Sequence, residues 1–293
     1  MFFFYHILNK PKIYNIYICY NQIHEFMYKP VINSIINILK NYYTYNEINI
    51  ILTVNLNENN LLKDDILILV GCNLILPDFN NLKEKSIYTI YYNTEPDINE
   101  LCTNEIWTYS KYAFTLYKKN HIHQIIRFIP IILETNVPFV PYHINSNLKL
   151  SFIGQFCARA DYKKHILINS DLLKNNLEEI NYLWNDIDYN NYISERPRIY
   201  LNLIKSMLPS LPTVRINKLL SHKCIIISEH TNYLDEEIYD GIIYFCYIEE
   251  IVNVYKNLIK KSNNELLEEA ENKYNLFYNK FHITNIKNQI LKK

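Results

Sequence analysis

Glycine is scarce in this sequence, with only 3 among 293 residues. None of them forms part of a Walker A loop, a G-x-G-x-x-G turn or a G-x-S-x-G elbow, and the sequence has no H-E-x-x-H motif. Those motifs mark the commonest nucleotide hydrolases, dehydrogenases and proteases. The sequence therefore gives no support to these function classes.

Net charge is also missing, because 30 basic residues balance 30 acidic ones. A chain without a net field does not recruit nucleic acid or anionic membrane over a distance. We therefore expect no nucleic-acid partner, and any contact with a phosphate group must come from a local site.

No apolar run reaches the roughly 20 residues that a membrane-spanning helix needs. The most apolar stretch, Phe128–Tyr142, is interrupted by Pro130, Glu134 and Pro138. The sequence predicts no transmembrane segment and a cytoplasmic protein, in the host cytoplasm if the protein is viral.

Metal-ligand spacing is absent as well. His121 and His123 have no third ligand nearby, and Asp64-Asp65 is typical of a turn, although a Mg²⁺ role for that pair stays open. We expect no bound metal and no covalently bound cofactor. The 6 cysteines form no C-x-x-C pair and are expected to be reduced core residues: Cys19, Cys72, Cys102, Cys157, Cys224 and Cys246.

The composition is that of a globular protein, with 49% hydrophobic and 20% charged residues. A single domain usually has about 100–200 residues, so this length predicts two domains. Tyrosine is abundant, at 27 residues, and we interpret most of these side chains as structural.

The first half alternates short β-branched runs with helical patterns, as βαβ units on a parallel sheet do. Predicted helices are His24–Asn41 and Lys111–Asn120. Predicted strands are Ile13–Tyr20, Ile48–Val54, Ile66–Gly71, Ser86–Tyr92, Glu105–Tyr109 and Ile125–Pro130.

A proline-containing linker, Pro130–Asn147, precedes a second α/β segment. Its predicted strands are Leu148–Gly154, Ile199–Leu203, Lys223–Ser228 and Gly241–Phe245, and its predicted helices are Asp161–Asn176, Val214–Ser221 and Ile248–Lys261. We expect domains over 1–140 and 148–262, and a helical tail over 263–293 that packs back on the first domain.

Polar residues that follow predicted strands are the candidate site, because ligands of open α/β sheets collect at the carboxyl ends of strands. Gly154 ends one strand, and Gln155 and Arg159 follow it. A glycine lets backbone N–H groups approach an anion, and an arginine adds a bidentate charge for a diphosphate. A strand–turn–helix with one glycine is also a common structural element.

A second candidate group comes from a helix and the strand after it. The helix carries Arg215 and Lys218, and the apolar strand ends at Ser228 and Glu229. A carboxylate at a strand end can accept hydrogen bonds from the hydroxyls of a ribose or hexose. The alternative is a solvated loop in which Glu229 caps the following turn.

Glu95 follows the strand that ends in Tyr91-Tyr92-Asn93-Thr94. This carboxylate could act as general base on an acceptor hydroxyl or orient it, and the alternative is a capping or loop residue.

The ordered series of segments resembles the group 1 glycosyltransferases of GT-B fold, especially the spore-maturation-protein-like branch of bacteria and large DNA viruses. The resemblance covers about Ser86–Leu258. Its segments are Ile90–Glu95, Glu105–Ser110, Phe152–Gly154 with Arg159, Ile199–Leu203, Arg215–Glu229 and Gly241–Phe245.

The resemblance implies two Rossmann-like domains facing a cleft, the second holding a nucleoside-diphosphate sugar and the first an acceptor, usually without a metal. It implies that Arg159 and Arg215 contact the diphosphate, and that Ser228 and Glu229 lie near the nucleotide or sugar. Two positions depart from the family pattern. Lys218 stands where a ribose-binding Glu is frequent, and Ile204 where a His is frequent.

We therefore predict a metal-independent glycosyltransferase of the hexosyltransferase type, acting in viral or bacterial glycan synthesis. Its partners would be a nucleotide sugar and a glycan, lipid or protein acceptor. The alternative is a catalytically degenerate GT-B scaffold that serves as a binding or structural protein. A flavodoxin-like or periplasmic-type binder shares the layered architecture, but the sequence has neither a signal peptide nor a glycine-rich phosphate loop.

Overall fold

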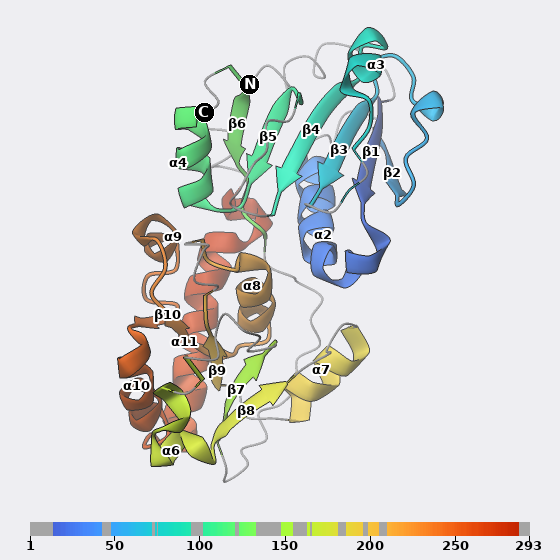
Figure 1. Cartoon of the computed structure of the whole chain (residues 1–293). Coiled ribbons are helices and arrows are strands. Elements are labelled where there is room, and N and C mark those ends of the chain that lie inside the picture. The colour runs from blue at the N-terminus through green and yellow to red at the C-terminus, as the bar shows by residue number, and fades with distance from the viewer. Residues whose placement is uncertain are drawn as a thin grey trace. The chain divides into compact units, whose positions relative to one another are not determined.

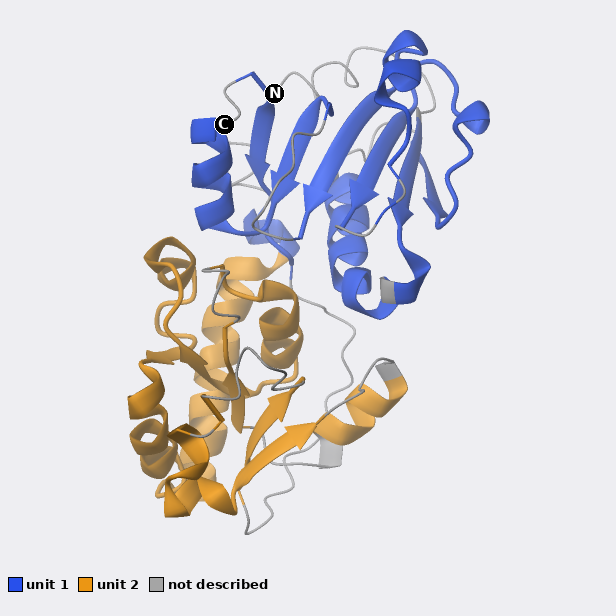
Figure 2. Ribbon diagram, viewed as in Figure 1, with its two compact units in different colours: residues 1–132, 283–293 blue, residues 133–282 orange. Residues whose placement is uncertain are grey.

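The computed structural model of the chain describes residues 14–42, 48–71, 74, 76–94, 102–120, 123–132, 148–154, 163–164, 166–180, 186–195, 199–204 and 210–286. The chain divides into two compact units, residues 1–132 with 283–293, and residues 133–282 (Figure 2). Each unit is built on one parallel β-sheet flanked by helices (Figure 1). The predicted fold class, two parallel-sheet α/β domains with a C-terminal helix, is confirmed.

The first unit holds a six-stranded sheet of order β2-β1-β3-β4-β5-β6. All its strand pairs are parallel. Its elements are β1 (Tyr14–Tyr20), η1 (Gln22–His24), α2 (Glu25–Tyr42), β2 (Ile48–Thr53), η2 (Glu58–Asn60), β3 (Ile66–Val70), α3 (Phe79–Glu84), β4 (Tyr88–Asn93), β5 (Glu105–Thr108), α4 (Lys111–Asn120) and β6 (Ile125–Phe128).

The centre of this sheet is the apolar strand β3, all five of whose residues are buried. Helix α2 packs against β1 and β3. Gly71 follows β3 with a φ of 91°, and a Cβ at this position would lie 2.3 Å from Cζ of Tyr28 on α2. The helix therefore approaches the strand end closely only because residue 71 is a glycine.

The second unit holds a five-stranded parallel sheet of order β11-β10-β9-β7-β8. Its elements are β7 (Leu150–Ile153), α6 (Asp171–Lys174), β8 (Leu177–Ile180), α7 (Asp186–Glu195), β9 (Ile199–Asn202), α8 (Thr213–Ser221), β10 (Ile225–Glu229), α9 (Tyr233–Ile238), β11 (Tyr244–Cys246), η3 (Ile248–Glu250), α10 (Ile251–Leu258) and α11 (Asn263–Phe281).

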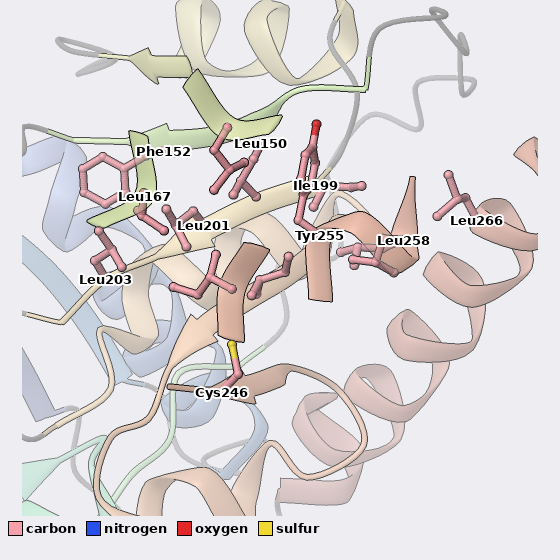
Figure 3. Packing of buried hydrophobic residues seen from close by; sticks show 14 of the residues in the cluster. Leu150, Phe152, Leu167, Ile199, Leu201, Leu203, Cys246, Tyr255, Leu258 and Leu266 are labelled. Atoms are coloured by element: carbon pink, nitrogen blue, oxygen red, sulfur yellow. The ribbon is translucent and has the colours of Figure 1, made fainter. Parts of the chain in front are cut away.

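One apolar cluster joins the second sheet to the helices that follow it in the sequence. Leu150 and Ile199 come from neighbouring strands, Tyr255 from α10, and Leu266 and Ala270 from α11 (Figure 3 labels all but Ala270). Helix α11 also packs against α8 and β10. The C-terminal helix is thus part of the core of the second unit.

Several predicted elements differ from the structure in their bounds. A single helix was expected over 161–176. In the structure, a turn at residues 169–170 separates the helical residues 166–168 from α6, and a second turn at 175–176 follows α6. Ser86, Lys223 and Gly241 were expected to start strands, but all three have positive φ, 58°, 58° and 73°, and lie in turns before β4, β10 and β11. Positive φ is incompatible with an extended strand.

Four free cysteines lie in the described residues. Cys19, Cys224 and Cys246 are buried as expected, whereas Cys102 is exposed, which corrects the prediction for that residue. Cys72 and Cys157 lie outside the described residues. The pair Asp64-Asp65 forms the expected turn, with a φ of 72° at Asp64.

Candidate functional site

The carboxyl edge of the second sheet gathers most of the predicted site residues that the structure describes. Strand β7 is the first strand of this unit, and it lies between β8 and β9. From β7 the chain continues to β8 on one side, whereas from β9 it continues to β10 and β11 on the other side. The strand order therefore reverses between β7 and β9. Ligands of open α/β sheets bind at such a switch point, outside the carboxyl ends of the strands.

Gly154 directly follows β7 and has a φ of 139°, which favours glycine. Its N–H donates a hydrogen bond of 2.9 Å to the carbonyl oxygen of Ile180 at the end of β8. A Cβ at position 154 would lie 3.7 Å from Nη2 of Arg215. The guanidinium of Arg215 therefore lies beside this strand end.

Arg215 lies in the first turn of α8. Its guanidinium carbon is 5.8 Å from the centre of the Phe152 ring. Among the described residues, no carboxylate is within ion-pair distance of this guanidinium. Burial lowers the pKa of Arg215 below its ordinary value of 12.5. A partly buried cation that has no carboxylate partner among the described residues favours an anionic ligand.

Glu229, at the end of β10, already has partners within the protein. Its Oε2 accepts a hydrogen bond of 2.5 Å from Nζ of Lys163 and one of 3.1 Å from the N–H of Ile204. Lys163 is 2% exposed and also donates to the carbonyl oxygen of Ile204, at 2.9 Å. One buried ammonium therefore neutralises Glu229, so that Glu229 does not pair with Arg215.

Ser228 precedes Glu229 and is fully buried. Its Oγ accepts a hydrogen bond of 2.9 Å from Nδ2 of Asn202, the last residue of β9, and donates one of 2.9 Å to the carbonyl oxygen of Glu229. These bonds fix the ends of β9 and β10 to one another. Ser228 thus positions the strand end from which Glu229 projects.

Lys218 follows Arg215 by one helical turn, and its side chain is largely buried. Its Nζ lies 4.3 Å from the centre of the Tyr189 ring, which comes from α7. A cation over an aromatic face gains roughly 0.5–2 kcal/mol. Lys218, which stands where a Glu is frequent in the resembled family, therefore contacts α7.

Three predicted site residues, Glu95, Gln155 and Arg159, lie outside the described residues. The described strand end before Glu95 stops at Thr94, whose carbonyl oxygen accepts a hydrogen bond of 2.8 Å from the hydroxyl of Tyr109. Within the part of the chain that the structure describes, no group of three or more His, Cys, Asp or Glu side chains could hold a metal ion. No described helix is long and apolar enough to span a bilayer.

Searches with the sequence found neither a matching protein-family model nor a matching curated protein. Solved structures do match. A trehalose-6-phosphate synthase has a TM-score of 0.62 at 9% identity, over 94% of this chain and 99% of that chain. WaaG, a glycosyltransferase involved in lipopolysaccharide biosynthesis, has a TM-score of 0.55 at 8% identity, over 95% and 100%.

A third match is S. aureus TarM in complex with fondaparinux, α-GlcNAc-glycerol and UDP. Its TM-score is 0.55 at 10% identity, over 78% of this chain. The chain spans about half of TarM, 55% of its length. The chain has the GT-B fold of these glycosyltransferases.

Within this GT-B fold, sequence reasoning missed Lys163. A Tyr-Lys-Lys-His run in a helical segment is typical of a solvated face, so the sequence carries no local signal for a buried ammonium. The signal is tertiary. It depends on strands β9 and β10 bringing Ile204 and Glu229 to the same place.

Proposed function

We propose that this chain is a glycosyltransferase that binds a nucleoside-diphosphate sugar at the carboxyl edge of the second sheet. The observation that carries the proposal is Arg215, a partly buried guanidinium without a carboxylate partner among the described residues, which lies beside Gly154 at the switch point. The fold supports the reaction class, because structures with this fold include glycosyltransferases.

In the proposed reaction, an acceptor oxygen forms a bond to the anomeric carbon of the sugar as the bond from that carbon to the diphosphate breaks. The departing nucleoside diphosphate gains negative charge. Arg215, together with Arg159, would stabilise this charge, and the backbone at Gly154 and Gln155 would approach the phosphates. These fixed cations would supply the charge that a metal ion supplies in other transferases.

Lys163 and Glu229 would act together in donor binding. A diphosphate can compete with Glu229 for Nζ of Lys163, because both offer anionic oxygens. Glu229 would then accept a hydrogen bond from a hydroxyl of the ribose or hexose. Ser228 would hold the strand end, and Lys218 would remain packed on Tyr189.

The remaining parts of the proposal concern the acceptor and the setting. Glu95 would serve as general base or orient the acceptor hydroxyl. We propose a hexosyltransferase of the spore-maturation-protein-like branch, acting in the cytoplasm in viral or bacterial glycan synthesis. The acceptor would be a glycan, lipid or protein.

A thermal-shift panel with UDP, GDP, CMP, dTDP and their sugar conjugates tests donor binding. A ligand at about a hundred times its dissociation constant stabilises the native state by roughly 2.7 kcal/mol, which raises Tm by several degrees. We expect a selective shift that Arg215→Ala abolishes. The control is Lys174→Ala, which removes an exposed cation of the same unit and should keep the shift.

Activity supplies the second readout. Once the donor is known, Arg215→Ala should lower kcat/KM at least tenfold, a loss of about 1.4 kcal/mol of transition-state stabilisation. No shift with any nucleotide would favour a catalytically degenerate scaffold. A shift that survives Arg215→Ala would remove the arginine from the site.

A further inference from the structure

The first unit contains a pocket of about 370 Å³ at the carboxyl edge of its sheet. Small-molecule sites have volumes of about 300–1,000 Å³, so the pocket is large enough for a small ligand. Segments after three neighbouring strands, β2, β1 and β3, form it. Its lining residues are Cys19, Asn21, Gln22, Ile23, Val54, Asn55, Leu56, Glu58, Leu74, Leu76 and Pro77.

Glu58 is the one charged residue among the described residues of the lining, and most of the others are apolar. No lysine or arginine is among the described residues that line the pocket. Both carboxylate oxygens of Glu58 accept neutral donors, the N–H of Asp78 at 2.9 Å and Nδ2 of Asn81 at 2.7 Å. The nearest cation with a recorded contact, Lys85, binds the backbone carbonyl oxygen of Glu58, at 2.9 Å. The described lining itself therefore offers an anion one carboxylate and no cationic lysine or arginine side chain.

The start of α2 also offers little to a phosphate group, although the first strand–helix turn of such folds frequently binds one. The side-chain oxygen of Asn21 accepts a hydrogen bond of 2.9 Å from the N–H of Ile23. Glu25 adds a negative charge in the first turn. One N–H of this turn is thus already bonded by a side chain, and the first turn of α2 carries a negative charge.

The rim of the pocket exposes apolar side chains. Ile23 is 86% exposed and Leu76 is 47% exposed, and the two come from the segments after β1 and β3. Polar groups lie beside them, because Gln22 and Asn55 belong to the same lining. A ligand with both hydroxyl groups and an apolar group would match this surface.

We propose that this pocket binds the acceptor of the transfer reaction, and that the acceptor is an uncharged glycoside with an apolar aglycone. The inference rests on the proposed glycosyltransferase function and adds the substrate class. Amide groups of Gln22 and Asn55 bond sugar hydroxyls, and Ile23, Leu56 and Leu76 contact the aglycone. A sugar phosphate is bound less well, because its charge would meet the carboxylate of Glu58 and no lysine or arginine in the described lining.

Direct binding to the full chain without donor tests the pocket independently of transfer. The probes are p-nitrophenyl glycosides of glucose, galactose, mannose and N-acetylglucosamine, with the methyl glycosides and 6-phosphates of the same sugars. Saturation-transfer NMR identifies binders and calorimetry gives Kd. We expect at least one aryl glycoside to bind at least tenfold more tightly than its methyl glycoside, and its 6-phosphate to bind more weakly still.

Two variants locate the binding. Ile23→Asp changes an exposed residue, so it should not unfold the chain. It should raise the Kd of the aryl glycoside at least fivefold. Ile187→Asp replaces a 73% exposed isoleucine on α7 of the second unit and should leave Kd unchanged. Gln22→Arg adds a cation to the lining and should bring the affinity of the 6-phosphate to at least that of the methyl glycoside.

Three results would overturn the inference: no aryl glycoside binds, the 6-phosphate binds the unmodified chain best, or Ile23→Asp and Ile187→Asp have equal effects. The nucleotide thermal shift separates the two proposals. A chain that binds aryl glycosides through Ile23 but shows no nucleotide shift has a pocket of the stated chemistry and is not a transferase. If nucleotides raise Tm but no glycoside binds, the proposed transferase function stands and the proposed acceptor class is wrong.

Discussion

Nζ of Lys163 lies 2.5 Å from Oε2 of Glu229, and the same ammonium bonds the carbonyl oxygen of Ile204 at 2.9 Å. The lysine comes from the segment after β7, and its partners come from the ends of β9 and β10. A buried ion pair holds together the three strand ends of the proposed donor site. Because Lys163 is 2% exposed and Glu229 18% exposed, water screens this pair little.

Removing either partner of this pair should destabilise the second unit. Lys163→Met leaves Glu229 without its ammonium, and we expect a loss of about 1–3 kcal/mol in the free energy of unfolding. The double variant with Glu229→Gln should cost less than the sum of the two single variants. Urea unfolding followed by circular dichroism measures all three.

The neighbouring Lys164 provides the control. It pairs with Glu179 at 2.8 Å, but the two side chains are 42% and 24% exposed. Lys164→Met should therefore cost less than about 1 kcal/mol. Equal losses of unfolding free energy for the two lysine variants would show that the buried pair of Lys163 stabilises the fold no more than an exposed pair does.

Gly71→Ala tests the close approach of α2 to the end of β3. The added Cβ would lie 2.3 Å from Cζ of Tyr28 and would hold a φ of 91°. We expect a loss above about 3 kcal/mol, because overpacking adds to backbone strain of about 1–2 kcal/mol. Thermal and urea unfolding measure the change.

Gly241→Ala is the matched control for this substitution. Gly241 has a φ of 73°, and the only neighbour recorded for an added Cβ is Cδ1 of Leu276 at 3.6 Å. This variant should lose only the backbone contribution of about 1–2 kcal/mol. Similar losses for both glycines would remove the steric contribution of Tyr28.

Alkaline pH should weaken the fold through buried tyrosines such as Tyr255. Burial raises the pKa of Tyr255 from its ordinary value of 10.0 to about 12. The folded state therefore holds this proton more tightly than the unfolded state. The resulting stability, about 2.7 kcal/mol at most, is full below pH 10 and is lost as the pH rises toward 12.

Tyr255→Phe should make the fall in unfolding free energy above pH 10 less steep. It should also lower stability near pH 7 by about 1 kcal/mol, since the hydroxyl donates to the carbonyl oxygen of Leu148. Burial raises the pKa of Tyr88 too, so part of the slope should remain. Tyr247→Phe, at a 65% exposed position, should leave the curve of the unmodified chain unchanged.

The sequence predicts best the elements whose composition matches their environment. The β-branched and apolar run Ile66–Val70 becomes the fully buried strand β3, and the alternation of strands and helices predicts two parallel sheets. Strand β8 was missed because Leu-Glu-Glu-Ile has no apolar run. Its glutamates are held by tertiary contacts, Glu178 to Tyr192 and Glu179 to Lys164.

In the candidate site, too, local sequence features were predictable and tertiary contacts were not. The positions of a glycine and an arginine near strand ends made Gly154 and Arg215 candidates, and the structure places these two residues beside each other. The engagement of Glu229 by Lys163 was not predictable, because the two residues are 66 positions apart and meet only through strand order. The pocket of the first unit likewise arises from three segments without a shared motif.

The division of the chain into units has a consequence for the order of folding during synthesis. Residues 283–293 belong to the first unit, and Ile286 among them is fully buried. The stretch 133–282 is continuous, so the second unit can fold as soon as it has left the ribosome. The first unit gains its last segment only afterwards, although N-terminal domains generally complete folding first. The domain begun first is thus the one completed last.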